Sequence, residues 1–248
     1  MSELNSFGYS SRGGLSDAIS RNRVLRNTFA LLALSMLPTM LGAWIGVTTG
    51  FSFFRSSPLM GMVIFMAVAF AFFWGIEKNK NSGTGVLLLL GFTFFMGLML
   101  TGLLTHTLQF RNGAQLIMMA FGSTALILFG MATWAATSKS NFEGLGKWLF
   151  IGVVLMILAS VANIFLQIPA LMLTIMVFAV GIFSAFILVD VQRIVNGGET
   201  NYVMATLSIY LNVYNIFTNL LSGLIILCRL IHPLDFLHHS GALLPLVR

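Results

Sequence analysis

Asp190 is the residue of this sequence whose position most clearly suggests chemistry. It follows a long apolar run, and Arg193 comes three residues later, about one helical turn along the same face. An acidic side chain at such a depth in an apolar segment is costly unless it is hydrogen-bonded or paired, so Asp190 is a candidate functional residue. The spacing alone equally allows an ordinary helix end, where an arginine extends to the polar surface.

A row of polar side chains in the last apolar segment is the second candidate. Its members recur at steps of four, three, four and three residues: Ser208, Asn212, Asn215, Asn219 and Ser222. This spacing places them on one face of a helix. If the helix crosses a membrane, that face must contact protein or water. The row therefore indicates either a hydrated path or hydrogen bonding between helices that only holds a bundle together.

The sequence carries none of the usual enzyme motifs. It lacks the H-E-x-x-H, G-x-S-x-G and phosphate-binding loop patterns, and Cys228 is its single cysteine. His106 lies in an apolar segment, whereas His232, His238 and His239 lie near the C-terminus without a regular spacing for metal ligands. We therefore expect no catalytic residue, no metal site and no cofactor, and we do not expect an enzyme.

The composition predicts the class of protein that must position these residues. Of the 248 residues, 58% are hydrophobic and 8% are charged, whereas a typical soluble domain has about 25% charged residues. So few charges cannot cover a globule of this size with a soluble surface. The composition therefore indicates a membrane protein with several spans. We interpret the net charge of +6 as a topology signal and expect no nucleic-acid partner.

Apolar tracts without charged residues predict an all-α integral membrane protein with a bundle of seven transmembrane helices. A spanning helix needs roughly 20 mostly apolar residues. The tract at 148–189 is long enough for two, and we place the break at Gln167, Ile168 and Pro169 because proline disfavours helix in the residue before it. The predicted spans are 28–50, 58–76, 84–108, 113–137, 147–166, 169–190 and 202–227.

The basic residues predict the orientation of these spans. Four arginines lie within the first 27 residues, and alternate connections between spans carry most of the other basic residues. Because excess Lys and Arg marks the cytoplasmic side, we expect a cytoplasmic N-terminus and an outside C-terminus. The predicted regions are a flexible cytoplasmic tail at 1–27, a seven-helix membrane domain at 28–227, and a C-terminal tail of unassigned role at 228–248.

Four motifs carry a resemblance to a known family: FGST at 121–124, NIF at 163–165, VDVQRI at 189–194 and LSIYLNVYNIFTNLL at 207–221. In this order the chain resembles the Bax inhibitor-1 (transmembrane Bax inhibitor motif) family over about residues 20–227. The segment GGETNYVMATLSIYLN at 197–212 is most similar to the bacterial YccA-like branch. The resemblance implies a bacterial inner (plasma) membrane protein whose seventh helix is central and wrapped by the other six.

The resemblance also implies a function. Bacterial members of the family are calcium-leak proteins in which two aspartates, on the sixth and seventh helices, share a proton and are linked to pH-dependent closure. Asp190 matches the first position, whereas the second position is Asn212. An Asp–Asn pair lacks the repulsion between two carboxylates but can still hydrogen-bond, so we expect a latch with a weaker or shifted pH response. The supporting polar residues are Arg193, Ser208, Asn215 and Asn219.

The YccA-like branch implies a function of a different class. Those relatives interact with FtsH, the membrane-anchored AAA protease, as a slow substrate and modulator, through their cytoplasmic N-terminal tail. The segment at 1–27 would suit a protease that pulls on an unstructured end. The expected partners are therefore the lipid bilayer, Ca2+ as a permeant ion, and this protease. A proton-coupled carrier is less favoured, because Asp190 is the one clearly titratable residue predicted in the membrane.

Overall fold

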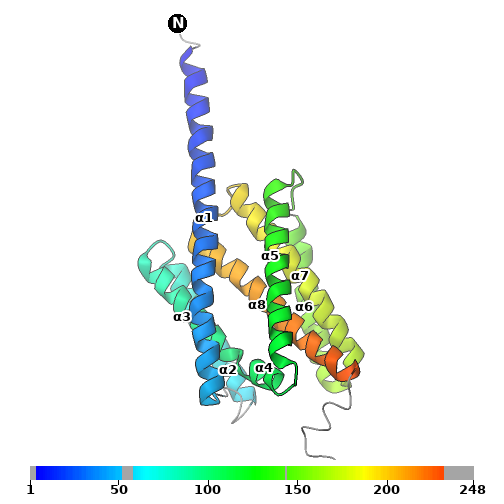
Figure 1. Ribbon diagram of the computed structural model, residues 1–248. Coiled ribbons are helices and arrows are strands. Elements are labelled where there is room, and N and C mark those ends of the chain that lie inside the picture. Colours follow the sequence, from blue (N-terminus) through cyan, green and yellow to red (C-terminus); the bar gives the residue numbers. More distant parts are fainter. Residues whose placement is uncertain (1–3, 52–57, 143, 232–248) are drawn as a thin grey trace, which may run out of the picture.

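The computed structural model describes residues 4–51, 58–142 and 144–231, and the regular secondary structure of this part is helical (Figure 1). Its helices are α1 (Leu4–Thr49), α2 (Pro58–Lys78), α3 (Gly83–Met99), α4 (Thr101–Leu108), α5 (Gly113–Thr137), α6 (Leu145–Leu166), α7 (Pro169–Val195) and α8 (Tyr202–Ile231). Within the described residues, seven segments are long and apolar enough to cross a membrane. The prediction of an all-α membrane protein with seven spans is confirmed.

The break between the fifth and sixth spans lies where proline predicts it. α6 ends at Leu166, and Gln167 takes a left-handed conformation with φ of 51°. Pro169 then occupies the first turn of α7, where its missing N–H leaves no helical hydrogen bond unmade. The main-chain N–H of Ile168 donates a hydrogen bond to the side-chain oxygen Oδ1 of Asn163 at 3.1 Å. This local chemistry separates two apolar helices that follow one another almost without a loop.

The third predicted span, 84–108, is divided in the structure. α3 ends at Met99 and α4 begins at Thr101, so that one candidate span contains both helices. At the break, the N–H of Leu100 bonds to the carbonyl oxygen of Gly97, three residues earlier, at 3.1 Å. This tighter turn interrupts the α-helical ladder. An apolar tract without proline carries no signal for such a break.

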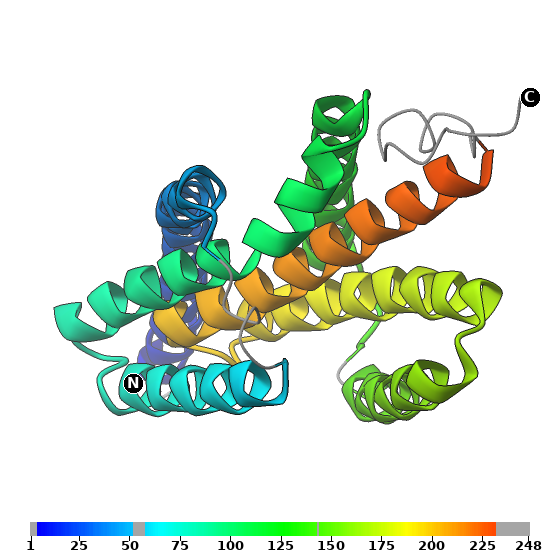
Figure 2. The ribbon, with the colours of Figure 1, turned by 90° about the horizontal axis from the view of Figure 1, so that it is seen from below.

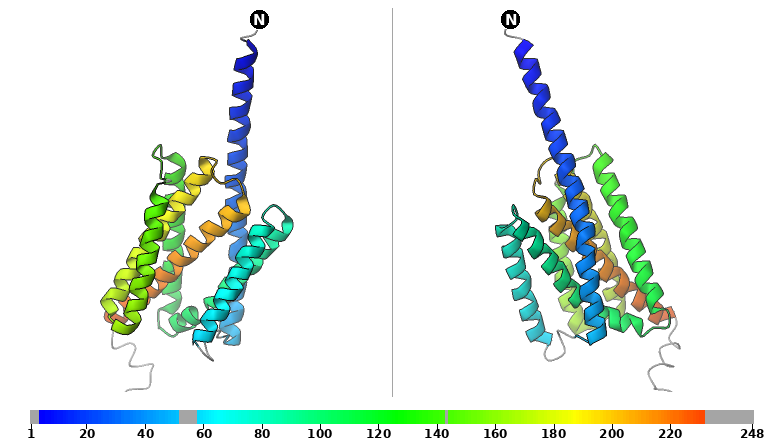
Figure 3. Two further views of the ribbon diagram at one scale, coloured as in Figure 1. Left: turned by 180° about the vertical axis from the view of Figure 1, so that it is seen from behind. Right: turned by 60° about the vertical axis from the view of Figure 1, so that its left-hand side comes forward.

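α1 begins well before the first predicted span. Its candidate membrane segment is Ile19–Thr49, but the helix itself starts at Leu4. Figure 1 shows this N-terminal part, in dark blue, extending beyond the ends of the other helices. Figure 3 shows the same extension from two further directions. Residues 4–27 of the expected tail are therefore helical, and the flexibility and cytoplasmic location of the tail stay predictions.

Glycines allow α1 and α3 to approach each other closely. A Cβ atom at Gly42 of α1 would overlap the carbonyl oxygen of Phe94, and a Cβ at Gly97 of α3 would overlap the carbonyl oxygen of Thr39. Lipid tails are as apolar as the helices, so close van der Waals packing of this kind is a main source of association between membrane helices. The two glycines therefore join α1 and α3 into a closely packed pair.

α8 lies against most of the other helices. It contacts α1, α2, α3, α4, α5 and α7, whereas α6 contacts α7 alone. Figure 2 shows α8, in orange, crossing the bundle obliquely with α7 beside it. Tyr210, Ile209 and Ile216 of α8 are fully buried and belong to the main hydrophobic core. Its central place in the bundle stays a prediction, because α6, one of the six other spans, does not contact it.

Candidate functional site

Asp190 and Asn212 meet where α7 packs against α8. The side-chain amide nitrogen of Asn212, Nδ2, donates a hydrogen bond to Oδ2 of Asp190 over 2.8 Å. Asp190 lies near the end of α7 and Asn212 lies within α8, so the short turn between these helices brings the two side chains face to face. Asn212 is buried and Asp190 is half-buried. A hydrogen bond to a carboxylate is stronger than one between neutral groups, so this contact holds the two helices at one register.

Two charged residues act on Asp190 from the end of α7 and the following turn. Arg193 and Glu199 both interact with it electrostatically. Arg193 is exposed, so solvent screens much of its attraction for the carboxylate. In the part of the chain that the structure describes, the hydrogen-bonded partner of Asp190 is the neutral amide of Asn212. The site thus pairs an acidic side chain with a neutral amide that donates a hydrogen bond to it.

The other polar residues predicted on this face of α8 make no hydrogen bond to this pair among those of the described residues. Nδ2 of Asn215 donates to the carbonyl oxygen of Leu211, and Nδ2 of Asn219 donates to that of Asn215, each at 2.8 Å. Ser208 is exposed. In the hydrogen bonds of the described residues, these two amides bond to their own helix one turn earlier and do not join α8 to a partner. Both side chains are half-buried, which leaves a polar strip along α8.

Two tyrosines attach α8 to α1 and α3. The hydroxyl of Tyr210 lies 2.9 Å from Oγ1 of Thr39 in α1 and donates to the carbonyl oxygen of Thr93 in α3 at 3.4 Å. The hydroxyl of Tyr214 donates to the carbonyl oxygen of Met96 in α3 at 3.3 Å. The sequence analysis did not single out either residue. Their spacing of four within an apolar span was the available signal, because a buried tyrosine hydroxyl needs a partner.

The side chain of Gln192 holds the α5–α6 connection against α7 by hydrogen bonds. This side chain is buried, at 3% exposure. Its Oε1 accepts a hydrogen bond from the main-chain N–H of Phe142 at 2.6 Å, and its Nε2 donates to the carbonyl oxygen of Ser140. Gln192 lies two residues after Asp190, so one turn of α7 carries both the contact to α8 and the contact to this loop. Sequence reasoning missed it, although a glutamine inside an apolar helix end is itself unusual.

Asn201 joins two turns of the chain. Its Oδ1 accepts from the N–H groups of Val203 and Met204, each at 3.0 Å, which caps the start of α8. Its Nδ2 donates to the carbonyl oxygen of Lys80 at 3.0 Å and to Oδ1 of Asn81 at 2.8 Å. The α2–α3 turn is therefore held against the first turn of α8.

These contacts hold three connections together at one end of the bundle, namely α2–α3, α5–α6 and α7–α8, and α1 joins them there. There Nη1 of Arg21 in α1 donates to the carbonyl oxygen of Val195 at the end of α7, at 3.3 Å. We call this the basic end, because it carries Arg21, Lys78, Lys80, Lys139, Lys147 and Arg193. It is the end that the charge pattern predicts to be cytoplasmic. That orientation stays a prediction.

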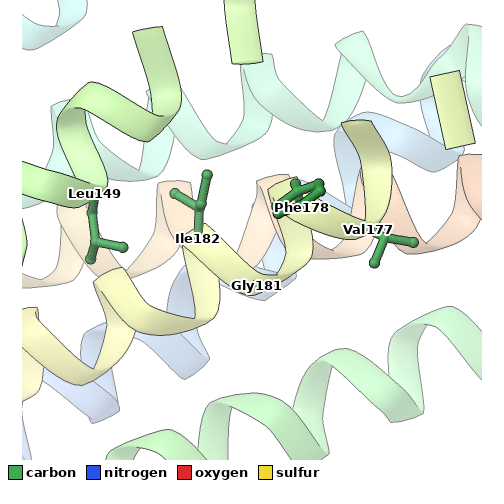
Figure 4. Close-up of a pocket in the computed structure, with 5 residues that line it drawn as sticks. All are labelled: Leu149, Val177, Phe178, Gly181 and Ile182. Carbon is green, nitrogen blue, oxygen red and sulfur yellow. The ribbon is translucent and has the colours of Figure 1, made fainter. Parts of the chain in front are cut away.

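Elsewhere in the described residues we find no cluster of metal-ligating side chains. No group of three or more His, Cys, Asp or Glu side chains within them could hold a metal. His232, His238 and His239 lie outside the described residues. A hollow of about 230 Å³ between α6 and α7 is lined by apolar residues, including Leu149 and Ile182 (Figure 4). Such a surface suits acyl chains and not a cation.

The chain is similar to known proteins over nearly its whole length. It matches the model of a family described as "Inhibitor of apoptosis-promoting Bax1" over residues 21–227, which include Asp190 and Asn212. It is 36% identical over 204 residues to the "Modulator of FtsH protease YccA" of Escherichia coli K12, covering 82% of this chain and 90% of that protein. The "Inner membrane protein YccA" of Escherichia coli O6:H1 is similar to the same extent. An uncharacterized protein of Neisseria meningitidis serogroup A is 38% identical over 211 residues, 84% of this chain and 92% of that protein.

Proposed function

This chain belongs to the Bax inhibitor-1 family of membrane proteins, and from that premise we propose that it is a Ca2+-permeable leak of the bacterial inner membrane. The observation that carries the proposal is the hydrogen bond between Asn212 of α8 and Asp190 of α7. In this proposal the pair is a latch: the leak is closed while the bond holds α7 against α8, and it conducts when the bond opens.

The chemistry of α8 suits a divalent cation. Ca2+ prefers oxygen ligands such as carboxylates and amide carbonyls. Asp190 supplies a carboxylate within a membrane helix, and Asn215 and Asn219 continue the polar strip along α8. Each of these amides carries an acceptor oxygen in addition to the nitrogen that bonds to its own helix. A cation leaving Asp190 of α7 would therefore meet further oxygen atoms along α8.

The amide at position 212 decides how this latch responds to pH. Two carboxylates at hydrogen-bonding distance can stay together only while they share a proton. Asn212 donates its own N–H, so the bond to Asp190 forms while the carboxylate is ionised. The latch consequently needs no proton to close, and we expect flux to respond to pH weakly or over a shifted range.

Reconstitution in liposomes tests the leak. The purified chain should carry Ca2+ to an enclosed dye faster than empty liposomes, at mildly acidic and at mildly alkaline pH. Asp190→Asn keeps an acceptor oxygen for Asn212 but removes the negative charge that attracts the cation, so it should lower the flux. Gln115→Asn, at an exposed position of α5 far from the latch in sequence, is the control and should leave the flux unchanged. A flux equal to that of empty liposomes at both pH values would refute the proposal.

Modulation of the membrane protease FtsH, without transport, is the second candidate. YccA of Escherichia coli carries this description and is 36% identical to this chain. The observation that favours it here is the N-terminal part of α1, which begins at Leu4 and projects beyond the other helices (Figure 3). A projecting chain end at the predicted cytoplasmic side is accessible to a membrane-anchored protease.

Removal of residues 2–18 tests this second candidate, because it leaves the candidate span that starts at Ile19 intact. The shortened protein should live longer in cells and should no longer co-purify with the protease. The same variant should retain its Ca2+ flux in liposomes if the leak is real. An unchanged lifetime and unchanged co-purification would refute the protease role without bearing on the leak.

A further inference from the structure

A pocket lies between α1 and the end of α7, at the basic end of the bundle. Its volume is about 240 Å³, and it is lined by Arg21, Asn22, Leu25 and Val195. Arg21 lies shortly before the charge-free tract of α1, which begins after Arg26, and Val195 is the last residue of the candidate span in α7. The pocket therefore lies at the level where the apolar interior of a bilayer meets the lipid headgroups.

The arginine of this pocket is held in place by its surroundings. Nη1 of Arg21 donates to the carbonyl oxygen of Val195 at 3.3 Å. Gly197, with φ of +79°, lies so close that a Cβ there would be 3.5 Å from Cδ of Arg21. A Cβ on the next residue, Gly198, would be 3.1 Å from Cγ of Arg193. Two arginine side chains thus border a turn made of two glycines.

We propose that this pocket binds the phosphate headgroup of an anionic phospholipid such as phosphatidylglycerol. A guanidinium carries five N–H donors and binds phosphate through paired N–H groups. Basic pockets between transmembrane helices at the cytoplasmic side are typical sites for anionic headgroups. The site is separate from the proposed leak and does not depend on it.

The apolar part of the pocket distinguishes a lipid from a free phosphate ion. Leu25 and Val195 are half-buried and form the apolar part of the pocket lining. They offer surface to the glycerol and the first acyl carbons of a lipid, which an inorganic ion does not have. The carboxylate of Glu199, the acid of the same turn, accepts a hydrogen bond from the N–H of Asn201 at 2.8 Å. A lipid here would bridge α1 and α7.

Native mass spectrometry of the full chain in neutral detergent tests the site. With phosphatidylglycerol or phosphatidylcholine added, the wild type should bind phosphatidylglycerol with about tenfold higher affinity than phosphatidylcholine. This ratio corresponds to the free energy of one charge-assisted hydrogen bond. Arg21→Gln should lose this preference. Arg23→Gln is the matched control: it removes the same charge from an exposed position two residues away that does not line the pocket. It should keep the preference.

A second variant separates lipid binding from folding, since Arg21 also bonds to Val195. Asn22→Trp places a bulky side chain in the pocket from an exposed position and leaves Arg21 unchanged. It should lose phosphatidylglycerol while keeping the thermal stability of the lipid-free protein. Equal binding of both lipids, equal losses in Arg21→Gln and Arg23→Gln, unchanged binding in Asn22→Trp, or displacement of the lipid by inorganic phosphate would each overturn the proposal.

Discussion

The side chain of Asn212 on α8 donates a hydrogen bond of 2.8 Å to the carboxylate of Asp190 on α7. One partner is an acid and the other is an amide that has no titration of its own. Two acids in the same place would repel each other once both were ionised. Position 212 is therefore where a pH response can be added to this chain by a single substitution.

Asn212→Asp should make Ca2+ flux dependent on pH. At low pH the two carboxylates share a proton and stay together, so flux should be low. At higher pH both ionise and repel, so the latch should open and flux should rise several-fold, against a weaker or shifted response in the wild type. Liposome flux measured across the pH range checks this. Asn215→Asp adds an acid to the same face, where the wild-type amide bonds to Leu211 and not to an acid, and should not reproduce the effect. A flat profile for Asn212→Asp would contradict the latch.

Gln192→Leu should release the α5–α6 connection. The change removes the hydrogen bonds of Gln192 to Phe142 and Ser140. Their loss should lower the local stability of the connection by about 1–3 kcal/mol, so that its locally unfolded state becomes about tenfold more populated. Trypsin should then cut at the exposed Lys139 correspondingly faster in detergent-solubilised protein. Gln115→Leu, at an exposed site near the start of α5, is the control. Equal cleavage rates in both variants would show that Gln192 does not hold the loop.

Tyr210→Phe should destabilise the bundle. The hydroxyl lies 2.9 Å from Thr39 and also bonds to the carbonyl of Thr93, so its removal should lower the free energy of unfolding by about 1–2 kcal/mol. A double-mutant cycle with Thr39→Val isolates the bond to α1, with an expected coupling of about 0.5–1.5 kcal/mol. Denaturant unfolding in micelles gives these values. Strictly additive effects would show that the two hydroxyls do not interact.

Alanine at two different glycines should act in opposite directions. At Gly42 the added methyl group would overlap the carbonyl oxygen of Phe94, so Gly42→Ala should destabilise the protein by about 1–3 kcal/mol. At Gly130 nothing lies within 4 Å of the added atom. Because alanine favours helix over glycine by about 1 kcal/mol, Gly130→Ala should be neutral or stabilising. Thermal unfolding of the two variants compares them directly, and losses of equal size would contradict close packing at Gly42.

The extent of each span follows well from the sequence, because lipid demands a continuous apolar segment and tolerates few charges. α5 runs from Gly113 to Thr137, the residues at which the charge-free tract predicted it to begin and end. Pro169 predicted the start of α7 through its fixed φ and missing N–H. The break at Leu100 lies within an apolar tract and changes only main-chain hydrogen bonding. Hydropathy does not register such a change.

The candidate site was predictable only in part. Asp190 and Asn212 stand out as polar residues in apolar tracts, and the structure places them in contact, although their role as a latch stays a prediction. Gln192 and Asn201 bond mainly to main-chain groups of distant loops, and a main-chain partner leaves no mark in the sequence. Helical spacing placed Asn215 on the polar face of α8, but spacing does not distinguish a bond to another helix from the observed bond to its own.

The links made by the start of α8 also impose an order on biosynthesis. Asn201 bonds to Lys80, a residue 121 positions earlier, and Thr206 bonds to the carbonyl of Thr28, 178 positions earlier. The ribosome has therefore delivered six spans to the membrane before their shared partner is synthesised. Until then the α2–α3 turn and the middle of α1 lack these hydrogen bonds. The last helix is thus the step that completes assembly, and a chain that stops short of it presents unclosed turns to the quality-control machinery of the cell.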